Sequence, residues 1–561
     1  MFKHTNRQLS LRSRLTSIPE GALIRLTSSW GERFRREVFP ILLAEEAQFA
    51  DLYATEGRPN WSVARLIGIL ILASFADLPD QDALDSLSFD LRWQHALDLD
   101  GTEAYLSRRS LVAFRTRLAE GDPEGRLLRR VFERLGEAQV TALSLSIKGQ
   151  RLDSTHVISD IRTRGRLWLF SSTLVSFLVE LRTFDAGRLQ QLSTGLHAWF
   201  QAREDEDHDV VLGADKLALA RWLVEVRDTF AVDEVVTALP GYQLVARLVR
   251  EHVTLVPATS TPIPPTGEPS PGGTGAAGEP GSAEPTGTPG GSIISLHKPS
   301  TPSTSLQSPH DPDAGYGHKG VGYEVQLAET YGNGDRPEVI LAVHVHPSGP
   351  PDCTQLEKVI IDLVERGVPP TDLQTDMAYN TVDNIEIALA HGINLAGPIP
   401  ASHRRPDLIG RESWQAVPGT GVLVACPSGH AVINHVERKI GTQSRPFAIV
   451  SGAACRACPM ASRCIARPIQ RSLANDGRGQ WEVEESRALL FRDRRLREQE
   501  TKEWKATYNM RAGIESTNAE LKKRHGLGRL RVRRLSRVHI AVLSKVMACN
   551  LKRWFSHPTQ G

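Results

Sequence analysis

The sequence predicts an α/β core joined to an N-terminal helical region and to a cysteine-bearing insertion. Three observations lead to this fold class. Residues 20–136 have helical periodicity, strand-like and helical runs alternate across residues 141–397, and residues 398–500 break that alternation. Strands that alternate with helices are typical of an α/β fold. Because the chain has 561 residues, it is long enough for several domains and a substantial core.

Composition and apolar patterning exclude several classes of protein. The longest apolar run, Leu66 to Ala76, is too short to span a membrane, which takes about 20 residues. No secretory signal is visible, and six cysteines in a chain of this length do not indicate a disulfide scaffold. No glycine-rich phosphate loop followed by Lys-Ser/Thr is present, so we expect no nucleotide cofactor. A cytoplasmic protein without a membrane partner is the expectation.

The N-terminal helical region, residues 20–136, contains one helix with an arginine-rich face. Ser107 or Ser110 is the candidate N-cap of that helix. Its expected exposed positions include Arg108, Arg109, Arg115 and Arg117. A short helix of this kind is compatible with a DNA-recognition helix, and equally with the surface helix of a bundle.

The predicted core begins with a strand over residues 141–153 that ends at Asp153, because leucine and isoleucine alternate with serine there. Residues 166–252 return to helical periodicity and form an insertion. Residues 256–315 are rich in Pro, Gly, Ser and Thr, so we expect a disordered loop. The remaining expected elements are strands at 323–331 and 339–346, a helix at 354–365, a short strand ending at Asp376, a helix at 382–391 and a strand at 393–396.

The C-terminal segment, residues 501–555, carries an ordered set of polar residues and an excess of positive charge. Tyr508, Arg511, Glu515 and Lys522 fall within an arc of about 60° if the segment is one α-helix. That helix is expected to run to about Arg524, with Gly526 as its C-terminal stop. Residues 501–554 hold fourteen Lys and Arg against three Glu, which is typical of a phosphate-binding surface and also compatible with a solvated helix.

Three acidic residues are candidates for one metal-dependent site. Asp153 and Asp376 are expected at strand ends, and Glu515 lies within the C-terminal polar set. Carboxylates that hold two divalent ions about 4 Å apart support phosphodiester cleavage, and Mg²⁺ or Mn²⁺ prefers such oxygen ligands. The neighbouring acids Asp160, Asp372 and Glu520 remain alternatives to these three.

The order of these motifs resembles the DDE-type transposases of bacterial insertion sequences. The matching segments are Asp153-Ser-Thr, Asp376-Met-Ala-Tyr, and Tyr508, Arg511, Glu515 and Lys522 at their Tyr-Arg-Glu-Lys spacing. The phrase His310-Asp-Pro-Asp-Ala followed by Gly322-Tyr323-Glu-Val-Gln is also similar to a segment of that family. The resemblance covers most of the chain outside residues 256–305.

This resemblance implies an RNase H-like catalytic core with Asp153, Asp376 and Glu515 as the catalytic, Mg²⁺-binding triad. It further implies that Arg511 and Lys522 contact DNA near the cleaved phosphate, with Tyr508 supporting the helix or stacking nearby. The implied activity is transposition: binding of terminal inverted repeats, metal-dependent cleavage, and strand transfer into target DNA by the freed 3′-hydroxyl. Homodimers acting at the bacterial nucleoid are expected by the same analogy. We also expect phosphate contacts from Arg529, Arg531, Arg533 and Arg534.

Four cysteines lie within the insertion at residues 398–500, namely Cys426, Cys455, Cys458 and Cys464. Four thiolates form a closed tetrahedral zinc site, and a Cys-x2-Cys pair is a common part of such sites. A structural Zn²⁺ is therefore expected, with His430 as a substitute ligand. A reduced cluster without metal and an iron–sulfur cluster are the alternatives.

Two other functions remain compatible with the sequence. A domesticated, non-catalytic DNA-binding protein would keep the fold and the cysteine insertion. An RNase H-like nuclease would cut DNA without strand transfer. Retention of all three acids favours the transposase.

Overall fold

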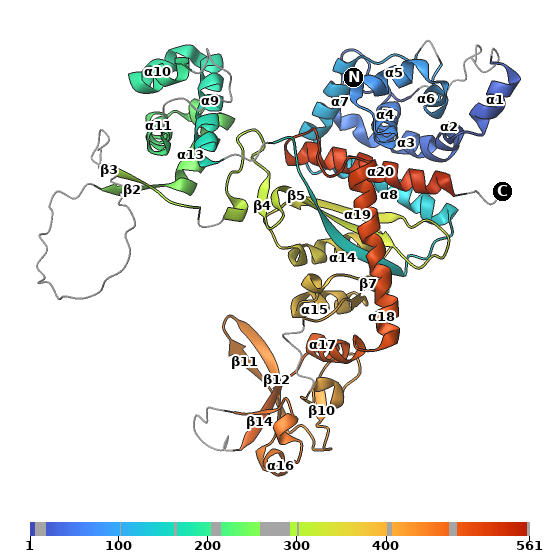
Figure 1. Ribbon diagram of the computed structural model, residues 1–561, viewed down its shortest axis with the longest axis vertical. Coiled ribbons are helices and arrows are strands. Elements are labelled where there is room, and N and C mark those ends of the chain that lie inside the picture. Colours follow the sequence, from blue (N-terminus) through green and yellow to red (C-terminus); the bar gives the residue numbers. More distant parts are fainter. Residues whose placement is uncertain are drawn as a thin grey trace, which may run out of the picture. The chain divides into compact units, whose positions relative to one another are not determined.

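The computed structural model (Figure 1) describes residues 1–5, 18–100, 103–161, 165–202, 215–257, 292–299, 302–400, 407–469 and 479–557. These residues divide into two compact units. Unit 1 comprises residues 1–157, 324–346 and 350–561, and unit 2 comprises residues 158–323 and 347–349. Unit 1 contains all three candidate acids.

Unit 1 begins with helices, as its sequence predicts. In chain order they are α1 (Glu20–Thr27), α2 (Trp30–Arg33), the π-helical turn η2 (Phe34–Val38), α3 (Phe39–Glu45), the 3₁₀ segment η3 (Glu46–Leu52), α4 (Val63–Ala76), α5 (Asp80–Phe89), α6 (Leu91–Ala96), α7 (Arg108–Gly121) and α8 (Arg126–Ala142). The apolar run at Leu66–Ala76 lies in α4, where most side chains are buried. The final helix of the chain, α20 (Leu535–Ser556), packs against α4, α7 and α8. Residues far apart in sequence therefore share one core.

The arginine-rich helix forms at the expected position. Ser107 is its N-cap, because the Ser107 hydroxyl accepts a hydrogen bond from the Ser110 amide at 3.2 Å. Arg108, Arg109 and Arg117 are exposed, as expected. Arg115 is only half-buried, since its guanidinium is paired with Asp80 at 2.7 Å.

Within the described residues, the central sheet has six strands: β5, β1, β7 and β8 lie side by side in that order, and both β6 and the short strand β4 (Gly315–Gly317) pair with β5. Its other strands are β1 (Gly149–Val157), β5 (Gly320–Thr330), β6 (Ile340–Pro347), β7 (Asp372–Gln374) and β8 (Asn394–Ala396). The pairs β1–β7 and β7–β8 are parallel. Helices α14 (Leu356–Glu365), preceded by the 3₁₀ turn η6 (Asp352–Gln355), and α15 (Val382–Ala390) make the crossovers on either side of β7. If β1, β5, β6, β7 and β8 are numbered 1 to 5 by their order in the chain, their spatial order across the sheet is 3-2-1-4-5.

The first predicted strand, residues 141–153, is placed wrongly by the sequence. Helix α8 continues to Ala142, and β1 spans Gly149–Val157. Leu143 and Leu145 are buried in the turn between them, so their alternation with serine reflects a packed connection. Asp153 consequently lies in the middle of a strand that is buried along almost its whole length.

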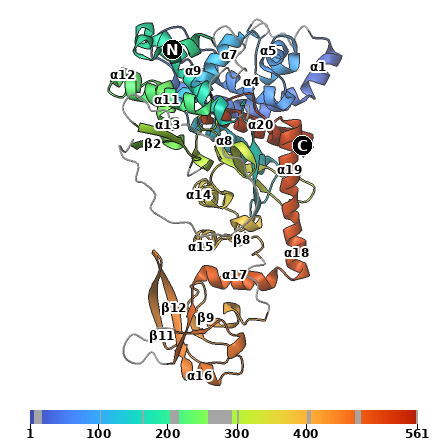
Figure 2. The ribbon, with the colours of Figure 1, turned by 60° about the vertical axis from the view of Figure 1, so that its left-hand side comes forward.

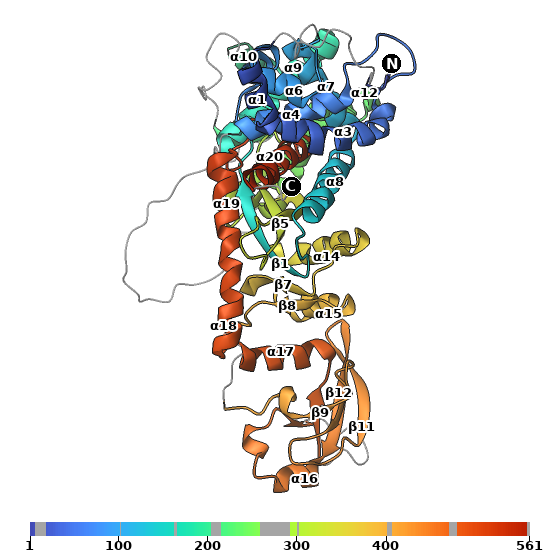
Figure 3. The same ribbon diagram turned by 90° about the vertical axis from the view of Figure 1, so that its right-hand side faces the viewer.

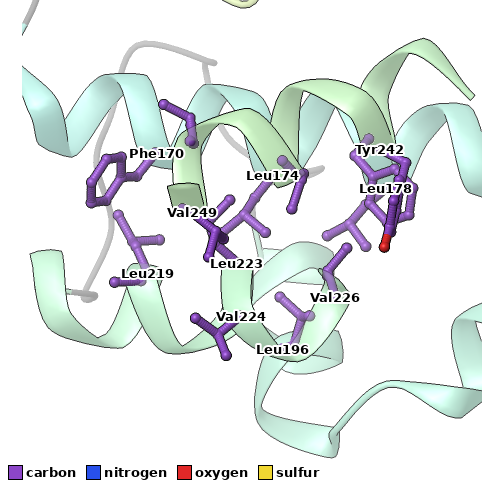
Figure 4. Packing of buried hydrophobic residues seen from close by; sticks show 14 of the residues in the cluster. Phe170, Leu174, Leu178, Leu196, Leu219, Leu223, Val224, Val226, Tyr242 and Val249 are labelled. Carbon is purple, nitrogen blue, oxygen red and sulfur yellow. The ribbon is translucent and has the colours of Figure 1, made fainter. Parts of the chain in front are cut away.

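Unit 2 is built around the predicted helical insertion, residues 166–252. Its helices are α9 (Arg166–Asp185), the 3₁₀ segment η4 (Ala186–Gln191), α10 (Thr194–Ala202), α11 (Lys216–Thr229), α12 (Glu234–Thr237) and α13 (Pro240–His252). Their apolar faces form one cluster that includes Phe170, Leu174, Leu223 and Val249 (Figure 4). Helix α9 with η4 is long and apolar enough to cross a membrane by composition, but its apolar side chains supply part of this cluster.

The disordered loop predicted for residues 256–315 extends too far at both ends, because the structure has ordered elements there. Strand β2 (Val253–Pro257) pairs antiparallel with β3 (Ser292–Leu296). After a 3₁₀ turn η5 (Pro302–Thr304), Leu306 is buried in the helical cluster and Asp311 is fully buried. Strand β4 (Gly315–Gly317) then pairs with the start of β5. Residues 258–291, the centre of the prediction, lie outside the described part of the chain.

The segment predicted as an insertion, residues 398–500, carries small sheets of its own in unit 1. The strands are β9 (Gln415–Ala416), β10 (Leu423–Ala425), β11 (Asn434–Ile440), β12 (Gln443–Ser451), β13 (Arg467–Pro468) and β14 (Gln480–Glu484). Strands β11 and β12 form the long hairpin visible in Figure 2. The helical pieces are η9 (Arg411–Ser413), α16 (Gly452–Ala457), η10 (Ala461–Arg463) and α17 (Arg487–Glu498), and α17 packs against α15.

The C-terminal polar set does not lie on one uninterrupted α-helix. It spans α18 (Lys502–Tyr508), a 3₁₀ turn η11 (Asn509–Ala512) and α19 (Gly513–Arg524), which together look like an almost continuous rod in Figure 3. The 3₁₀ turn changes the angular spacing assumed for the helix. The predicted stop is confirmed, because Gly526 has a φ of 61° and α19 ends at Arg524.

Candidate catalytic site

Asp153 is the most buried of the three candidate acids. Its side chain, on the central strand β1, accepts hydrogen bonds from Arg511 Nη2 at 3.2 Å and from Asn518 Nδ2 at 3.0 Å. Burial raises the pKa of Asp153 to about 6; Arg511 opposes the rise, while the charges of Glu515 and Asp376 add to it. The pKa of Asp153 therefore responds to both of the other predicted acids.

Asp376 follows β7, the parallel neighbour of β1, and is half-buried. Its carboxylate caps the 3₁₀ turn η7 (Met377–Tyr379) by accepting a 2.8 Å hydrogen bond from the Ala378 amide. The preceding carbonyl, that of Thr375, accepts a 3.1 Å hydrogen bond from the Tyr508 hydroxyl. This hydrogen bond connects the α18–α19 rod to the residue that precedes Asp376. Tyr508 therefore has a structural contact at the site.

Glu515 lies in the first turn of α19 and its side chain is 62% exposed. Arg511 bridges it to Asp153, because Nη1 of Arg511 lies 3.5 Å from Glu515 Oε1 while Nη2 contacts Asp153. Strand β1 and helix α19 therefore meet at one guanidinium. The exposed Glu515 carboxylate leaves this group of acids open to solvent.

A buried carboxylate, Glu329, fixes helix α19 against the sheet. Glu329 lies on β5, is fully buried, and pairs with Arg151 on β1 at 2.8 Å and with Arg553 on α20 at 3.1 Å. The hydroxyl of Thr517, two residues after Glu515, also donates to Glu329 at 2.8 and 2.9 Å. Three elements, β1, α19 and α20, thus converge on this acid of β5, which orients the first turn of α19.

Asp352 is a fourth acid in this neighbourhood that the sequence analysis missed. Its side chain in η6 accepts hydrogen bonds from Ser154 at 2.6 Å and from Gln326 at 3.0 Å. Burial raises the pKa of Tyr379 well above its ordinary value, and the charges of Asp352, Asp153 and Asp376 act in the same direction. Asp352 stands in a Pro-Asp-Cys turn without periodic context, so only the fold shows that it lies near these acids.

Two of the alternative acids are engaged elsewhere in unit 1. Glu520 pairs with Arg553 at 2.8 Å, and Asp372 accepts a 2.6 Å hydrogen bond from Asn394. Asp160, the third alternative, is exposed and belongs to unit 2.

The remaining predicted DNA contacts are exposed. Lys522 lies on the last turn of α19 beside Lys523 and Arg524. The turn between α19 and α20 carries the exposed side chains of Arg529, Arg531, Arg533 and Arg534. Lys522 is seven residues beyond Glu515, which is about 10 Å along a helix axis.

The four cysteines of the insertion gather around one small cavity of about 30 Å³, together with His430. Burial raises the pKa of Cys455 to about 11, and the other three cysteines add to the rise. Cys426, Cys455 and Cys464 also pack against an apolar cluster that includes Trp414.

No three of the four cysteine sulfurs, all among the described residues, lie within 4.8 Å of one another. Within the described residues, three other potential ligand atoms, from Glu520, His525 and Cys549, do lie within 4.8 Å of one another. Arg553 already binds Glu520, and Lys552 contributes to lowering the pKa of the buried His525. That positive surrounding disfavours a cation, so this group is best described as a contact between α19 and α20.

Two comparisons with protein families bear on this arrangement. Residues 425–555 match the family described as Transposase DDE domain, and residues 31–117 match the family described as Transposase domain (DUF772). The first match contains Glu515 and the four cysteines, and the second contains most of α7. No curated protein and no solved structure matches the chain.

These matches support a transposase of the DDE type, and the mixed α/β sheet fits a DDE transposase domain. A DDE domain implies an enzyme of the polynucleotidyl-transferase kind that acts on DNA. Such enzymes generally use divalent metal ions, which is consistent with a cluster of carboxylates.

Proposed function

We propose that the chain is a DNA transposase that binds the terminal repeats of its element and catalyses metal-dependent cleavage and strand transfer. Its main support is that Asp153, Asp376 and Glu515 lie close enough for their charges to interact: both other acids help to raise the pKa of Asp153. The strand pattern 3-2-1-4-5 supports an RNase H-like core, with Asp153 on the central strand and Asp376 two residues after the end of its parallel neighbour. The other proposed domains are residues 20–136 for DNA binding, 398–500 for the cysteine insertion and 501–555 for the acid-bearing helix.

The donor set fits a hard divalent ion such as Mg²⁺ or Mn²⁺. Burial and the negative charges of Glu515 and Asp376 raise the pKa of Asp153, and a bound cation relieves that unfavourable charge. When bound, such ions supply activation of the attacking oxygen and stabilisation of the leaving oxygen. Asp153, Asp376 and Glu515 are the proposed ligands.

The protein's own residues then position the substrate. Arg511 lies between Asp153 and Glu515 and can turn one of its guanidinium edges to a DNA phosphate. The Glu329 contacts hold α19 at a fixed angle to β1, which keeps Glu515 in register with Asp153.

Water serves as the nucleophile for the first cut, and the freed 3′-hydroxyl serves for joining, so the protein forms no covalent bond to DNA.

An excision assay with a marked element tests this proposal. Glu515→Gln keeps the size of the side chain and removes its charge, so we expect DNA binding to persist and excision to be abolished. Glu503→Gln is the matched control, because Glu503 is an exposed acid on α18 of the same rod. Excision by Glu515→Gln at the level of the control would remove Glu515 from the catalytic role. Cleavage without joining by the unmodified protein would identify a nuclease, and DNA binding without cleavage a non-catalytic protein.

A structural Zn²⁺ on Cys426, Cys455, Cys458 and Cys464 is the second part of the proposal. The support is their convergence on one cavity, although a bound ion requires the thiols to lose protons and draw closer. Metal analysis of the purified protein is expected to find one zinc per chain, and Cys458→Ser is expected to lose it. An equal zinc content in both proteins would contradict this ligand set.

Because two element ends must be joined, we further propose that two copies act together on DNA. Light scattering of the protein bound to duplex ends measures the number of chains directly, and a single chain per joined pair of ends would contradict it.

A further inference from the structure

A cavity of about 600 Å³ lies in unit 1 where helices α4, α5 and α7 meet the C-terminal turn and α20. Its charged lining residues are Arg108, Arg115, Arg529, Arg531, Arg537 and Lys545, against Asp77 and Asp80. Six cations thus face two acids inside one concave surface. We call this cavity the basic cleft.

The protein itself neutralises only part of this charge. Asp80 forms an ion pair with Arg115, with an N–O distance of 2.7 Å. Arg108, Arg529, Arg531 and Arg537 have exposed side chains, and within the described residues no ion pair is found for them.

Lys545 adds a half-buried ammonium to the cleft. It donates a hydrogen bond to the His525 carbonyl, and burial lowers its pKa. The charge of Arg531 contributes to the lowering, while Asp77 opposes it. Asp77 thus offsets Lys545, and among the described residues no carboxylate pairs with the four exposed arginines. An anionic ligand is the chemical complement of such a surface.

The arginines are held in place by apolar anchors. Leu527 and Leu530 are buried, whereas Arg529 and Arg531 on either side of Leu530 are exposed. This alternation anchors the backbone from which the two arginine side chains extend, because the segment cannot turn them inward without exposing Leu530. Guanidinium groups bind phosphate oxygens through paired hydrogen bonds.

We propose that the basic cleft binds the sugar–phosphate backbone of duplex DNA beside the cleavage site. This inference rests on the proposed function and adds where the DNA runs. Gly526 lines the cleft and lies eleven residues from Glu515, almost all of them in α19, which gives about 16 Å along the helix axis. At about 3.4 Å per base pair, the cleft contacts phosphates roughly 5 base pairs from the cleaved phosphate at the three-acid site.

The lining of the cleft also gives it a linking role. Arg108 and Arg115 belong to the segment that matches the DUF772 transposase domain, and Arg529, Arg531 and Arg537 belong to the segment that matches the DDE domain. One DNA backbone in the cleft therefore contacts both segments at once. Recognition by the N-terminal helices and cleavage by the acids are coupled through this shared piece of DNA.

Salt-dependent binding to a 30-base-pair duplex, measured by fluorescence anisotropy in EDTA, tests the cleft without requiring catalysis. The double variant Arg531→Ala/Arg537→Ala removes two exposed cations, so the slope of log K against log salt is expected to fall by about 2. Arg531→Lys/Arg537→Lys keeps both charges and is expected to restore most of the slope. Arg250→Ala, an exposed arginine on α13, is the matched control and is expected to leave the slope unchanged.

An alanine double variant with the slope of the control would overturn the proposal. So would equal binding of a 30-base-pair RNA duplex, which would make the ligand a general polyanion. Competition by inorganic pyrophosphate at low millimolar concentration, with no effect of duplex length, would identify a small-anion site and equally overturn it. Because EDTA removes divalent metal, these results are independent of whether Glu515 is catalytic.

The position of the contact is tested with neutral methylphosphonate linkages placed singly along a DNA end that the protein cleaves. Substitution about 4–6 base pairs from the cut is expected to weaken binding of the unmodified protein and to have little further effect on the alanine double variant. Sensitivity confined to positions more than about 10 base pairs away would contradict the proposed path of the DNA.

Discussion

The helical cluster of unit 2 and the polar contacts beneath helix α19 in unit 1 are both buried, but they are held by different forces. In unit 2, side chains such as Phe177, Leu223 and Val245 pack against one another without charged partners. Beneath α19, the fully buried Glu329 pairs with Arg151, Arg553 and Thr517. Apolar packing tolerates changes that conserve volume, whereas a buried ionic group depends on every partner.

This difference suggests a division of roles. Buried ion pairs contribute little net stability compared with apolar packing, but removing one partner is severely destabilising. Such contacts define direction better than apolar surfaces do, since each hydrogen bond has a preferred geometry. We interpret the Glu329 contacts as setting the angle of α19, and the apolar cluster of unit 2 as the source of stability of that unit.

The largest effect is expected from Glu329→Ala, which leaves Arg151 without its buried counter-charge and Arg553 with Glu520 as its remaining acidic partner. We expect the free energy of unfolding of unit 1 to fall by about 3–5 kcal/mol and metal-dependent nicking to fall with it. Chemical denaturation followed by tryptophan fluorescence measures the first quantity. A change below about 1 kcal/mol would show that the Glu329 contacts are not structural determinants of the site.

A smaller and more local effect is expected from Leu223→Ala in α11, whose side chain is fully buried in unit 2. The lost contacts and the cavity are expected to lower the free energy of unfolding of unit 2 by about 3 kcal/mol. Leu223→Met, which nearly conserves volume, is expected to cost less than about 1.5 kcal/mol. Hydrogen exchange resolves the two units; equal loss of protection in both units would contradict the separation of roles.

The smallest effect is a pH dependence of stability at His525, which is fully buried after α19. Burial, with a contribution from Lys552, lowers the pKa of His525 from 6.5 to about 4. Between these two pH values His525 is protonated in the unfolded chain and neutral in the folded chain. The free energy of unfolding therefore falls as pH decreases from about 6.5 towards 4. At pH 5 the contribution is about 2 kcal/mol relative to neutral pH.

Denaturation of the unmodified protein and of His525→Gln at pH 7.5 and pH 5 measures this contribution, because glutamine does not titrate. The variant is expected to lose less stability on acidification than the unmodified protein. An identical loss in both would indicate that His525 is protonated in the folded state.

Much of the fold follows from local sequence patterns. Ser107 as an N-cap, Gly526 as a helix stop and the strands near Tyr323 and Val339 each depend on a few neighbouring residues, and the structure has them at or near the expected positions. Errors arose where burial comes from distant segments. Leu143 alternates with serine as a strand would, but it packs in a turn after α8.

The candidate site was predictable in part. The structure brings Asp153, Asp376 and Glu515 into one electrostatic neighbourhood, and their catalytic role stays a prediction. Asp352 and Glu329 could not be found from sequence, because an isolated acid carries no local signal of burial. Glu329 ends a strand-like run of apolar and polar residues, and only the arrival of Arg151 and Arg553 from distant segments makes its charge tolerable.

The central claim is that three separate acids hold divalent metal together, and titration with Mn²⁺ monitored by electron paramagnetic resonance tests it most directly. Asp153→Asn, Asp376→Asn and Glu515→Gln are each expected to weaken Mn²⁺ binding at least about tenfold. Glu503→Gln is expected to bind as the unmodified protein does. Unchanged Mn²⁺ affinity in any one of the three acid variants would contradict the assignment of that residue and, with it, the three-acid site.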